Sequence, residues 1–164
     1  MLVKSLLKPQ VSKWFDKSVS SELYASNLYK HIANQLQRLG YFGTQKFFLK
    51  ESAEELEHYQ KLVDYVNDMG SVINVPQVPL MTDKIDNIMD ALELAYNTEL
   101  DLMNQYHQFY EQSQDDYEDC ITATFLIEFL QIQRKSVGQY GDLISRFEKN
   151  TTDVFEFDHF MKKQ

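Results

Sequence analysis

The segment from Phe48 to Met69, FLKESAEELEHYQKLVDYVNDM, decides the fold of this chain. Residues spaced alternately three and four apart form one stripe, or seam, along it, which is the pattern of a helix in a bundle. This seam consists of Phe48, Glu51, Glu55, His58, Leu62, Tyr65 and Met69. The stripe is mostly aromatic or apolar at its ends and carries Glu55 and His58 near its middle. Because these two residues are three apart, both side chains leave the same face of the helix.

Three other segments carry the same period, and each of these seams becomes polar near its middle, at Glu22, Glu99 and Gln133. A buried carboxylate is costly unless it is paired or binds a cation. Three carboxylates, one imidazole and one amide on four inward faces therefore predict a metal site. The three further seams are Phe15, Ser18, Glu22, Ala25, Tyr29, Ile32, Leu36; then Ile85, Ile88, Leu92, Ala95, Glu99, Leu102, Tyr106, Phe109; and Leu126, Phe129, Gln133, Ser136, Tyr140, Leu143, Phe147.

The composition favours one all-α domain that spans residues 1–164. A chain of this length can bury a substantial core but is too short for two comfortable domains. It contains only 5 Gly and 3 Pro, which favours long uninterrupted helices. The net charge of −9 argues against nucleic acid as a partner and suits the attraction of cations.

Cysteine usage and hydropathy predict a cytoplasmic protein. Cys120 is the only cysteine, so no disulfide can form within one chain, and a thiolate zinc site is excluded. Residues 1–15 lack the apolar stretch of a signal peptide. No run of 18 apolar residues occurs, so we expect no membrane partner.

Start and stop signals place four long helices at about 10–149 and a short fifth helix at about 153–162. Asp153 and Glu156 have the spacing of a capping box for the fifth helix. The long helices are expected from Gln10 to Arg38, from Thr44 as N-cap to Met69, from Thr82 or Asp83 to Gln112, and, after a short turn at 114–116, to Lys149.

The connections predict the topology. Short links join the first helix to the second and the third to the fourth, so each pair is antiparallel. The eleven residues Ser71–Met81 hold two prolines and lack helical period, which indicates an extended connection. It reaches at most about 36–40 Å, nearly the roughly 40–50 Å length of the helices. The second and third helices can therefore lie parallel, in a four-helix bundle with one long crossover.

The donor set suits iron better than other metals. Carboxylates with one imidazole are good ligands of Fe(II) and Fe(III), whereas magnesium and calcium would use no imidazole and structural zinc prefers more nitrogen and sulfur. Glu55, between two other glutamates, could bridge two ions. Two adjacent Fe(II) ions can deliver two electrons to dioxygen, which one ion cannot.

Several polar side chains have two interpretations. Gln133 is either a core amide or a group that orients water or oxygen beside the metal, and Tyr29 is either a packed ring or a redox or orienting residue. Glu51, Glu54 and Glu57 form a solvated stripe or a surface that collects ferric ions. The acidic residues of 115–119 are expected to compensate a helix N-terminus rather than form a funnel for cations. Ordinary surface or packing roles are expected for His31, His107 and His159.

Together these residues resemble a family. Glu22-Leu23-Tyr24 with Tyr29, the segment Glu54-Glu55-Leu56-Glu57-His58, and then Glu99 and Gln133 are similar to the non-haem ferritins, most of all the bacterial ones. The resemblance covers about residues 10–160. It implies the ferritin-like bundle and a hollow homo-oligomeric shell of 24 subunits. Such shells oxidise Fe(II) with dioxygen or peroxide and store the ferric product as a mineral.

Carried over by position, the resemblance implies a di-iron centre. Glu22, Glu55 and His58 would hold one iron, and Glu55 and Glu99 the other, with Gln133 beside it. Tyr29 matches the tyrosine next to that centre, and by the same analogy Glu54 and Glu57 would face the interior of the shell or lie close to it.

This chain departs from the bacterial pattern at four places. Ser136 stands where many bacterial ferritins carry Glu, and Ile132 and Lys135 stand where they carry acidic residues of a third iron site. These differences argue against a third site. The stretch from Gln133 to Ser136 is similar to that of animal heavy chains, whose ferroxidase centre works with a small residue after the glutamine, so we expect a working but weaker second site. Leu56 replaces the methionine through which bacterioferritins bind haem, so no haem is expected.

Three other functions compete with iron storage by oxidation. A structural shell subunit would nucleate mineral but oxidise iron slowly, which Ser136 and Lys135 favour. A di-iron enzyme acting on an organic substrate would carry a second Glu-x-x-His, and the fourth helix has none. A metal-free interaction bundle would pair its seam glutamates with Lys or Arg, and no seam position is basic.

Overall fold

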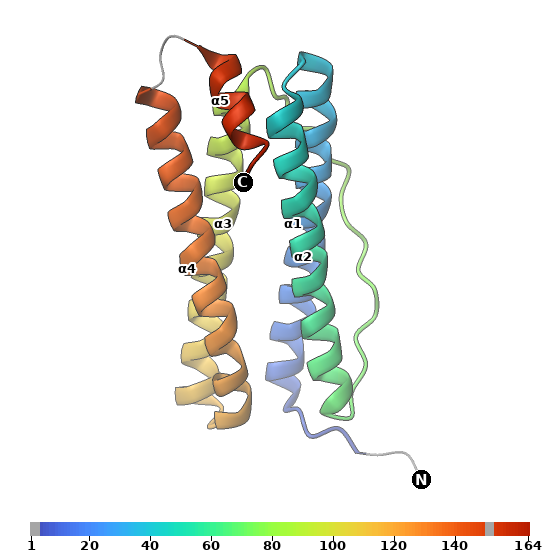
Figure 1. Cartoon of the computed structure of the whole chain (residues 1–164). Helices are drawn as coiled ribbons and strands as arrows, with labels where there is room; N and C mark the ends of the chain where they lie inside the picture. Colours follow the sequence, from blue (N-terminus) through green and yellow to red (C-terminus); the bar gives the residue numbers. More distant parts are fainter. Residues whose placement is uncertain (1–3, 150–152) are drawn as a thin grey trace.

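The computed structural model describes residues 4–149 and 153–164. Four long helices, α1 (Pro9–Leu39), α2 (Phe42–Asp68), α3 (Ile88–Glu111) and α4 (Cys120–Lys149), lie side by side along one axis (Figure 1). A π-helical turn, η1 (Gln112–Asp116), joins α3 to α4, and α5 (Val154–Met161) lies at one end of the bundle. No strand occurs among the described residues, so the all-α prediction is confirmed.

The chain connections have the predicted topology. α1 packs against α2 and α3 against α4, each as an antiparallel pair. From Ser71 to Ile85 the chain has neither helix nor strand and runs back along the outside of the bundle (Figure 1). α2 and α3 therefore run in the same direction, as expected for a bundle with one long crossover. None of the helices in the described parts has an apolar stretch long enough to span a membrane.

The predicted seams form the core. Every seam residue of α1 and of the third segment is buried, and the aromatic rings of Phe15, Phe48, Phe109 and Phe129 are fully covered. In α2 the end of the seam, at Tyr65 and Met69, is only partly buried. The rings pack in contact, for example Phe15 edge-on to Phe109 at 5.1 Å between centroids. Burial of these faces is the main force that fixes the helices around the polar middle.

The start of α2 differs from the prediction because α5 caps it. Thr44 is not the N-cap; it lies in the first turn of a helix that begins at Phe42. Asp158 of α5 accepts hydrogen bonds from the Gly43 and Thr44 amides, at 2.9 and 2.7 Å, and from the Thr44 hydroxyl at 2.8 Å. A Cβ atom at Gly43 would lie 1.8 Å from the Asp158 carbonyl oxygen, so only glycine permits this approach.

The start of α3 was also predicted too early. The segment before it stays extended because α1 binds its backbone: His31 and Gln35 contact the Asp83 carbonyl oxygen at 2.7 and 2.9 Å. Gln35 also accepts from the Ile85 amide at 3.0 Å. The helix begins only at Ile88, where the Asn87 side chain accepts from the Asp90 amide at 3.0 Å.

The predicted turn at 114–116 is part of the π-helical turn η1. Gln112 holds it in place, since its side-chain oxygen accepts from the Trp14 indole and the Tyr117 hydroxyl, both at 2.9 Å. At the other end of the chain, Asp153 accepts from the amides of Phe155 and Glu156, which confirms the predicted cap of α5.

Candidate metal centre

Three predicted ligands meet halfway along the bundle. Glu22 of α1 and Glu55 and His58 of α2 offer ligand atoms that all lie within 4.8 Å of one another. His58 Nδ1 lies 3.3 Å from Glu55 Oε2 and 3.8 Å from Glu22 Oε2. Glu22 is completely buried and Glu55 is 3% exposed, whereas His58 is at the edge of the cluster and partly accessible. The helical spacing of residues 55 and 58 therefore brings both side chains to Glu22, as predicted.

Glu22 is the least satisfied side chain of this group. Its Oε1 atom accepts a hydrogen bond from the Tyr106 hydroxyl, but Oε2 is buried and has no hydrogen-bond partner among the described residues. Burial, together with the nearby Glu55 carboxylate, raises the pKa of Glu22 well above its usual value. A carboxyl group in such a place is stable either when it is protonated or when it is ionised beside a cation.

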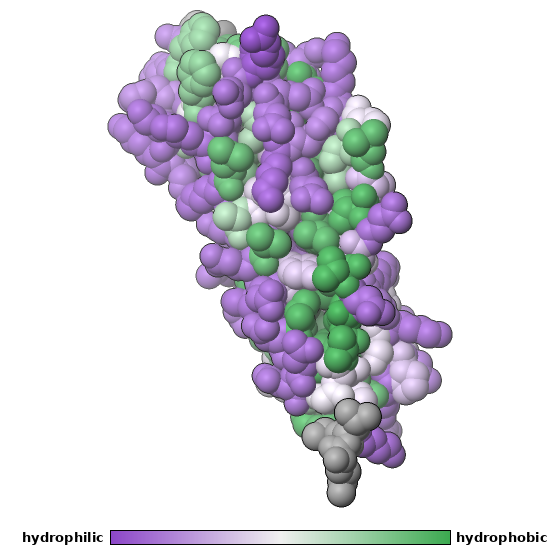
Figure 2. Space-filling view, turned by 90° about the vertical axis from the view of Figure 1, so that its right-hand side faces the viewer, coloured by the Kyte–Doolittle hydropathy of each residue, from purple (hydrophilic) through white to green (hydrophobic). Residues whose placement is uncertain are grey.

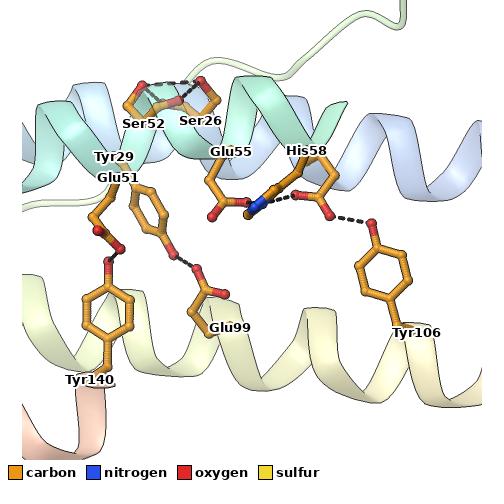
Figure 3. Close-up of polar contacts among 10 residues, drawn as sticks. Ser26, Tyr29, Glu51, Ser52, Glu55, His58, Glu99, Tyr106 and Tyr140 are labelled. Carbon is orange, nitrogen blue, oxygen red and sulfur yellow. Dashed lines mark hydrogen bonds and ion pairs between the residues drawn. The ribbon is translucent and has the colours of Figure 1, made fainter. Parts of the chain in front are cut away.

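Glu99 and Gln133 form a second group on α3 and α4. Both are fully buried, and Glu99 is not part of the three-residue cluster. The Tyr29 hydroxyl donates to Glu99 Oε1 (Figure 3), and with its NH₂ group toward α3 the Gln133 amide donates to Glu99 Oε2 at 2.8 Å. Both oxygens of Glu99 thus have a donor, unlike those of Glu22.

Glu55 and Glu99 nevertheless act on each other. Burial raises the pKa of both carboxyl groups, and the charge of Glu99 raises that of Glu55 further. The Tyr29 hydrogen bond opposes the increase at Glu99. The described part of the chain supplies no Lys or Arg in an ion pair with Glu22, Glu55 or Glu99. Buried carboxylates that repel one another can be stabilised by bound cations.

Tyr106 also belongs to the site, although its seam position alone predicted only core packing. It lies seven residues after Glu99 on α3, as Tyr29 lies seven residues after Glu22 on α1. Each tyrosine crosses to the other helix and donates to its glutamate, Tyr29 to Glu99 (Figure 3) and Tyr106 to Glu22. The repeated Glu-to-Tyr spacing was visible in the sequence and would have found this pair.

Glu51 is a fourth buried carboxylate, one helical turn before Glu55. It is 5% exposed and accepts a hydrogen bond from the Tyr140 hydroxyl at 3.2 Å (Figure 3). Burial raises its pKa to about 7, with a further contribution from Glu54. The expected acidic stripe is therefore divided, because Glu54 and Glu57 are exposed while Glu51 points into the bundle. The position of Glu51 on the seam of α2 was the sequence signal for its inward orientation.

The remaining predicted residues lie around the centre or away from it. Ser136 is half-buried on the α4 seam, three residues after Gln133, and Lys135 is exposed. Leu56 is 44% exposed. Among the acidic residues of the 115–119 segment, Asp119 accepts hydrogen bonds from the Thr122 amide and hydroxyl at the start of α4. His31 tethers the end of the crossover, which agrees with the structural role expected of it.

Comparison with known proteins points to one family. The family model of the ferritin-like domain matches residues 13–150. A ferritin of Pacifastacus leniusculus is 28% identical over 155 residues, covering 91% of this chain and 86% of the relative. A bacterial non-heme ferritin of Staphylococcus haemolyticus is 26% identical over 161 residues, covering 96% and 93%. The open-pore ferritin of the archaeon Archaeoglobus fulgidus has the same fold, with a TM-score of 0.92 at 19% identity, over 96% of this chain and 98% of that one.

Proposed function

Because this chain belongs to the ferritin family of iron-storage proteins, we propose that it stores iron and oxidises Fe(II) at the centre between α1, α2, α3 and α4. Iron is then the substrate and the cargo of the protein. Ferric product would be kept as a mineral inside a shell of 24 copies.

The observation that carries this proposal is the unsatisfied carboxylate of Glu22. Its Oε2 atom is buried, has no hydrogen-bond donor among the described residues, and faces the His58 ring at 3.8 Å. A purely structural core would provide a hydrogen-bond donor at this place. The oxygen-rich donor set with a single imidazole fits Fe(II) and Fe(III) better than zinc or magnesium.

The side chains take different roles in this proposal. Glu22, Glu55 and His58 bind one Fe(II) ion through ligand atoms that are already close together. Glu99 binds a second ion, with Gln133 beside it, after the Tyr29 and Gln133 hydrogen bonds yield to the metal. Glu55 joins the two ions. Each Fe(II) ion supplies one electron, so the pair supplies the two electrons that dioxygen or peroxide accepts.

Burial supports the chemistry in a second way. The hydroxyl pKa values of Tyr29 and Tyr106 are raised well above their usual values, chiefly because both rings are fully buried. Both hydroxyls therefore stay protonated and keep donating to the glutamates. They hold the carboxylates in position while the charge at the centre changes.

The surface of the crossover supports assembly into a shell. Val72, Val75 and Leu80 are 80%, 76% and 89% exposed. Figure 2 shows green, apolar surface along the face that carries the crossover. Apolar side chains gathered on one extended segment are typical of a surface that another copy covers. Among the described residues, the 72–80 backbone also makes no hydrogen bond to another backbone group, so a second copy could bind it directly.

The proposal is tested by adding Fe(II) in air to the metal-free protein and following ferric absorbance and oxygen uptake. The Glu55→Ala, His58→Ala double variant removes the shared ligand and the imidazole. A Glu54→Ala, Glu57→Ala variant of the exposed neighbours on α2 is the matched control. Fast oxidation that saturates near two irons per chain, lost in the first variant and kept in the second, supports the ferroxidase. Slow oxidation that is equal in all three proteins would refute it.

A shell subunit that stores iron but oxidises it slowly is the second candidate. The half-buried Ser136 favours it, because a hydroxyl replaces a carboxylate that would strengthen the second ion site. This candidate predicts mineral loading without a fast first phase. Replacing Ser136 with Glu would then create the fast phase, whereas in a working ferroxidase it would only strengthen binding of the second ion.

A further inference from the structure

A groove with a volume of about 730 Å³ lies between α4 and α5, and none of the candidate metal ligands lines it. Figure 1 shows α5 beside the last turns of α4. Four cationic side chains line the groove, while Asp142 is the one acidic residue among its lining residues. The four cations are Arg134, Lys135, Arg146 and Lys149.

This concentration of positive charge is unusual in this chain, which carries 16 basic against 25 acidic residues. In the described parts of the chain, none of the four cations forms an ion pair with a carboxylate. Cations near a helix C-terminus compensate its dipole, which accounts for Arg146 and Lys149. It does not account for Arg134 and Lys135, which lie near the middle of α4.

Arg146 is held in place by the neighbouring helix. Its guanidinium lies 3.7 Å from the centroid of the Phe160 ring of α5. A stacked guanidinium keeps its N–H groups free for a ligand and loses less conformational freedom when it binds one. Arginine also matches the geometry of a phosphate group, to which it can donate two parallel hydrogen bonds.

Gly138 is a second and independent observation. Glycine within a helix costs about 0.5–1 kcal/mol relative to alanine. A conserved shape or a close contact usually explains such a residue, but a Cβ atom at Gly138 would meet no atom within 4 Å, and its φ is not in the left-handed region. Neither packing within the chain nor backbone conformation requires glycine here. Its effect is to leave the wall of the groove open between the cations.

We propose that the α4–α5 groove binds oxyanions of the phosphate class. The cationic residues extend from 134 to 149, which is about 22 Å along a helix at ~1.5 Å per residue. That length exceeds a single phosphate group, so a short polyphosphate would contact more of the cations than inorganic phosphate does. The site is separate from the iron centre and does not depend on the proposed oxidation of Fe(II).

The test is calorimetric titration of the metal-free, full-length protein with inorganic phosphate and, separately, with tripolyphosphate. The proposal predicts saturable binding, with tripolyphosphate about ten-fold tighter or more, because several charge-assisted hydrogen bonds add. Gly138→Leu fills the groove without changing any charge, and its higher helix propensity favours folding. Lys135→Gln with Lys149→Gln removes two cations and leaves the Arg146–Phe160 contact unchanged.

Both variants are expected to weaken tripolyphosphate binding about ten-fold or more. The control is Lys4→Gln with Lys30→Gln, which makes the same change in charge at exposed positions outside the groove and should change the affinity less than about two-fold. Three results would overturn the proposal: no saturable binding, unchanged binding by Gly138→Leu, or an equal loss in the control. A Gly138→Leu variant that assembles differently but binds tripolyphosphate normally would assign the groove to contact with another protein chain instead.

Discussion

On α1 and α2, Glu22, Glu55 and His58 converge with one carboxylate oxygen left without a donor, whereas on α3 and α4 both oxygens of Glu99 accept hydrogen bonds. The two halves have a common plan. A glutamate is followed seven residues later by a tyrosine on α1 and again on α3, and each tyrosine donates to the opposite glutamate.

The difference between the halves comes from α2 and α4. At the same spacing of three residues, α2 offers Glu55 and His58 while α4 offers Gln133 and Ser136. Glu55 and His58 leave Glu22 Oε2 without a hydrogen-bond donor, whereas the Gln133 amide donates to Glu99. The first half is therefore prepared to bind an ion, and the second must break hydrogen bonds to do so. We expect two Fe(II) ions to bind with unequal affinity.

The largest effect is expected from Glu55→Ala, which removes the one ligand common to both halves. The initial rate of Fe(II) oxidation should fall by about 1,000-fold or more, equivalent to about 4 kcal/mol of transition-state stabilisation. Stopped-flow ferric absorbance measures it. Glu57→Ala, an exposed position two residues later, is the control and should keep the rate. A Glu55→Ala protein that oxidises iron normally would show that the two halves do not share this ligand.

The next effect is a change in stability with pH at Glu51. Its pKa is about 7 in the folded protein against an ordinary value of 4.5, so between these values the folded state holds a proton that the unfolded state has lost. The stability of the metal-free protein should therefore fall as the pH rises from about 4.5 to about 7. Glu51→Gln should remove about 3 kcal/mol of this loss.

Urea unfolding of metal-free wild type and Glu51→Gln at pH 4.5 and 7.5 checks this. The two proteins should differ little at the lower pH, and the variant should be the more stable one at the higher pH. Tyr140→Phe removes the hydrogen bond that the Glu51 carboxylate accepts from Tyr140 and should not reproduce the gain. Stability curves that stay parallel across the pH range would contradict burial of an uncompensated carboxyl group at this position.

A smaller effect is expected from Glu99→Gln, which removes the carboxylate of the second half and leaves the first half intact. Oxidation should slow by about 10–100-fold, or about 1.4–2.7 kcal/mol, because one ion alone supplies one electron. Anaerobic Fe(II) binding should retain its tight first step. Loss of the first step in this variant would mean that Glu99 belongs to the first ion after all.

The smallest effect is expected from the two tyrosines, whose replacement removes a hydrogen bond to a glutamate but no candidate ligand. Tyr29→Phe takes away one donor to Glu99 and should make that carboxylate easier for a second ion to capture, by about 3–10-fold. Tyr106→Phe is the matched variant on the other half and should increase the affinity for the first ion instead. Equal changes in both steps, in either variant, would show that the tyrosines only pack.

The helical bundle and the meeting of three candidate ligands could be predicted from the sequence, because both follow from the spacing of the residues along the seams. Glu22, Glu55 and His58 were brought together as expected from their helical positions. The predicted starts of α2 and α3 were wrong because long-range contacts determine them. Asp158 caps α2 across 114 residues, and Gln35 binds the Ile85 amide, so that α3 begins later than predicted. Neither interaction has a signal in the local sequence. Glu51 and Tyr106 occupy seam positions, but periodicity alone does not distinguish a side chain that forms a hydrogen bond in the site from one that only packs in the core.

The most direct test of the account is to titrate the metal-free protein with Fe(II) without oxygen and to follow binding calorimetrically. The account predicts two ions per chain in two separate steps. The tighter step should be lost in Glu22→Gln and kept in Glu99→Gln. A single step of two equal ions, or a tight step that survives Glu22→Gln, would contradict the claim that the α1–α2 half is prepared for metal and the α3–α4 half is not.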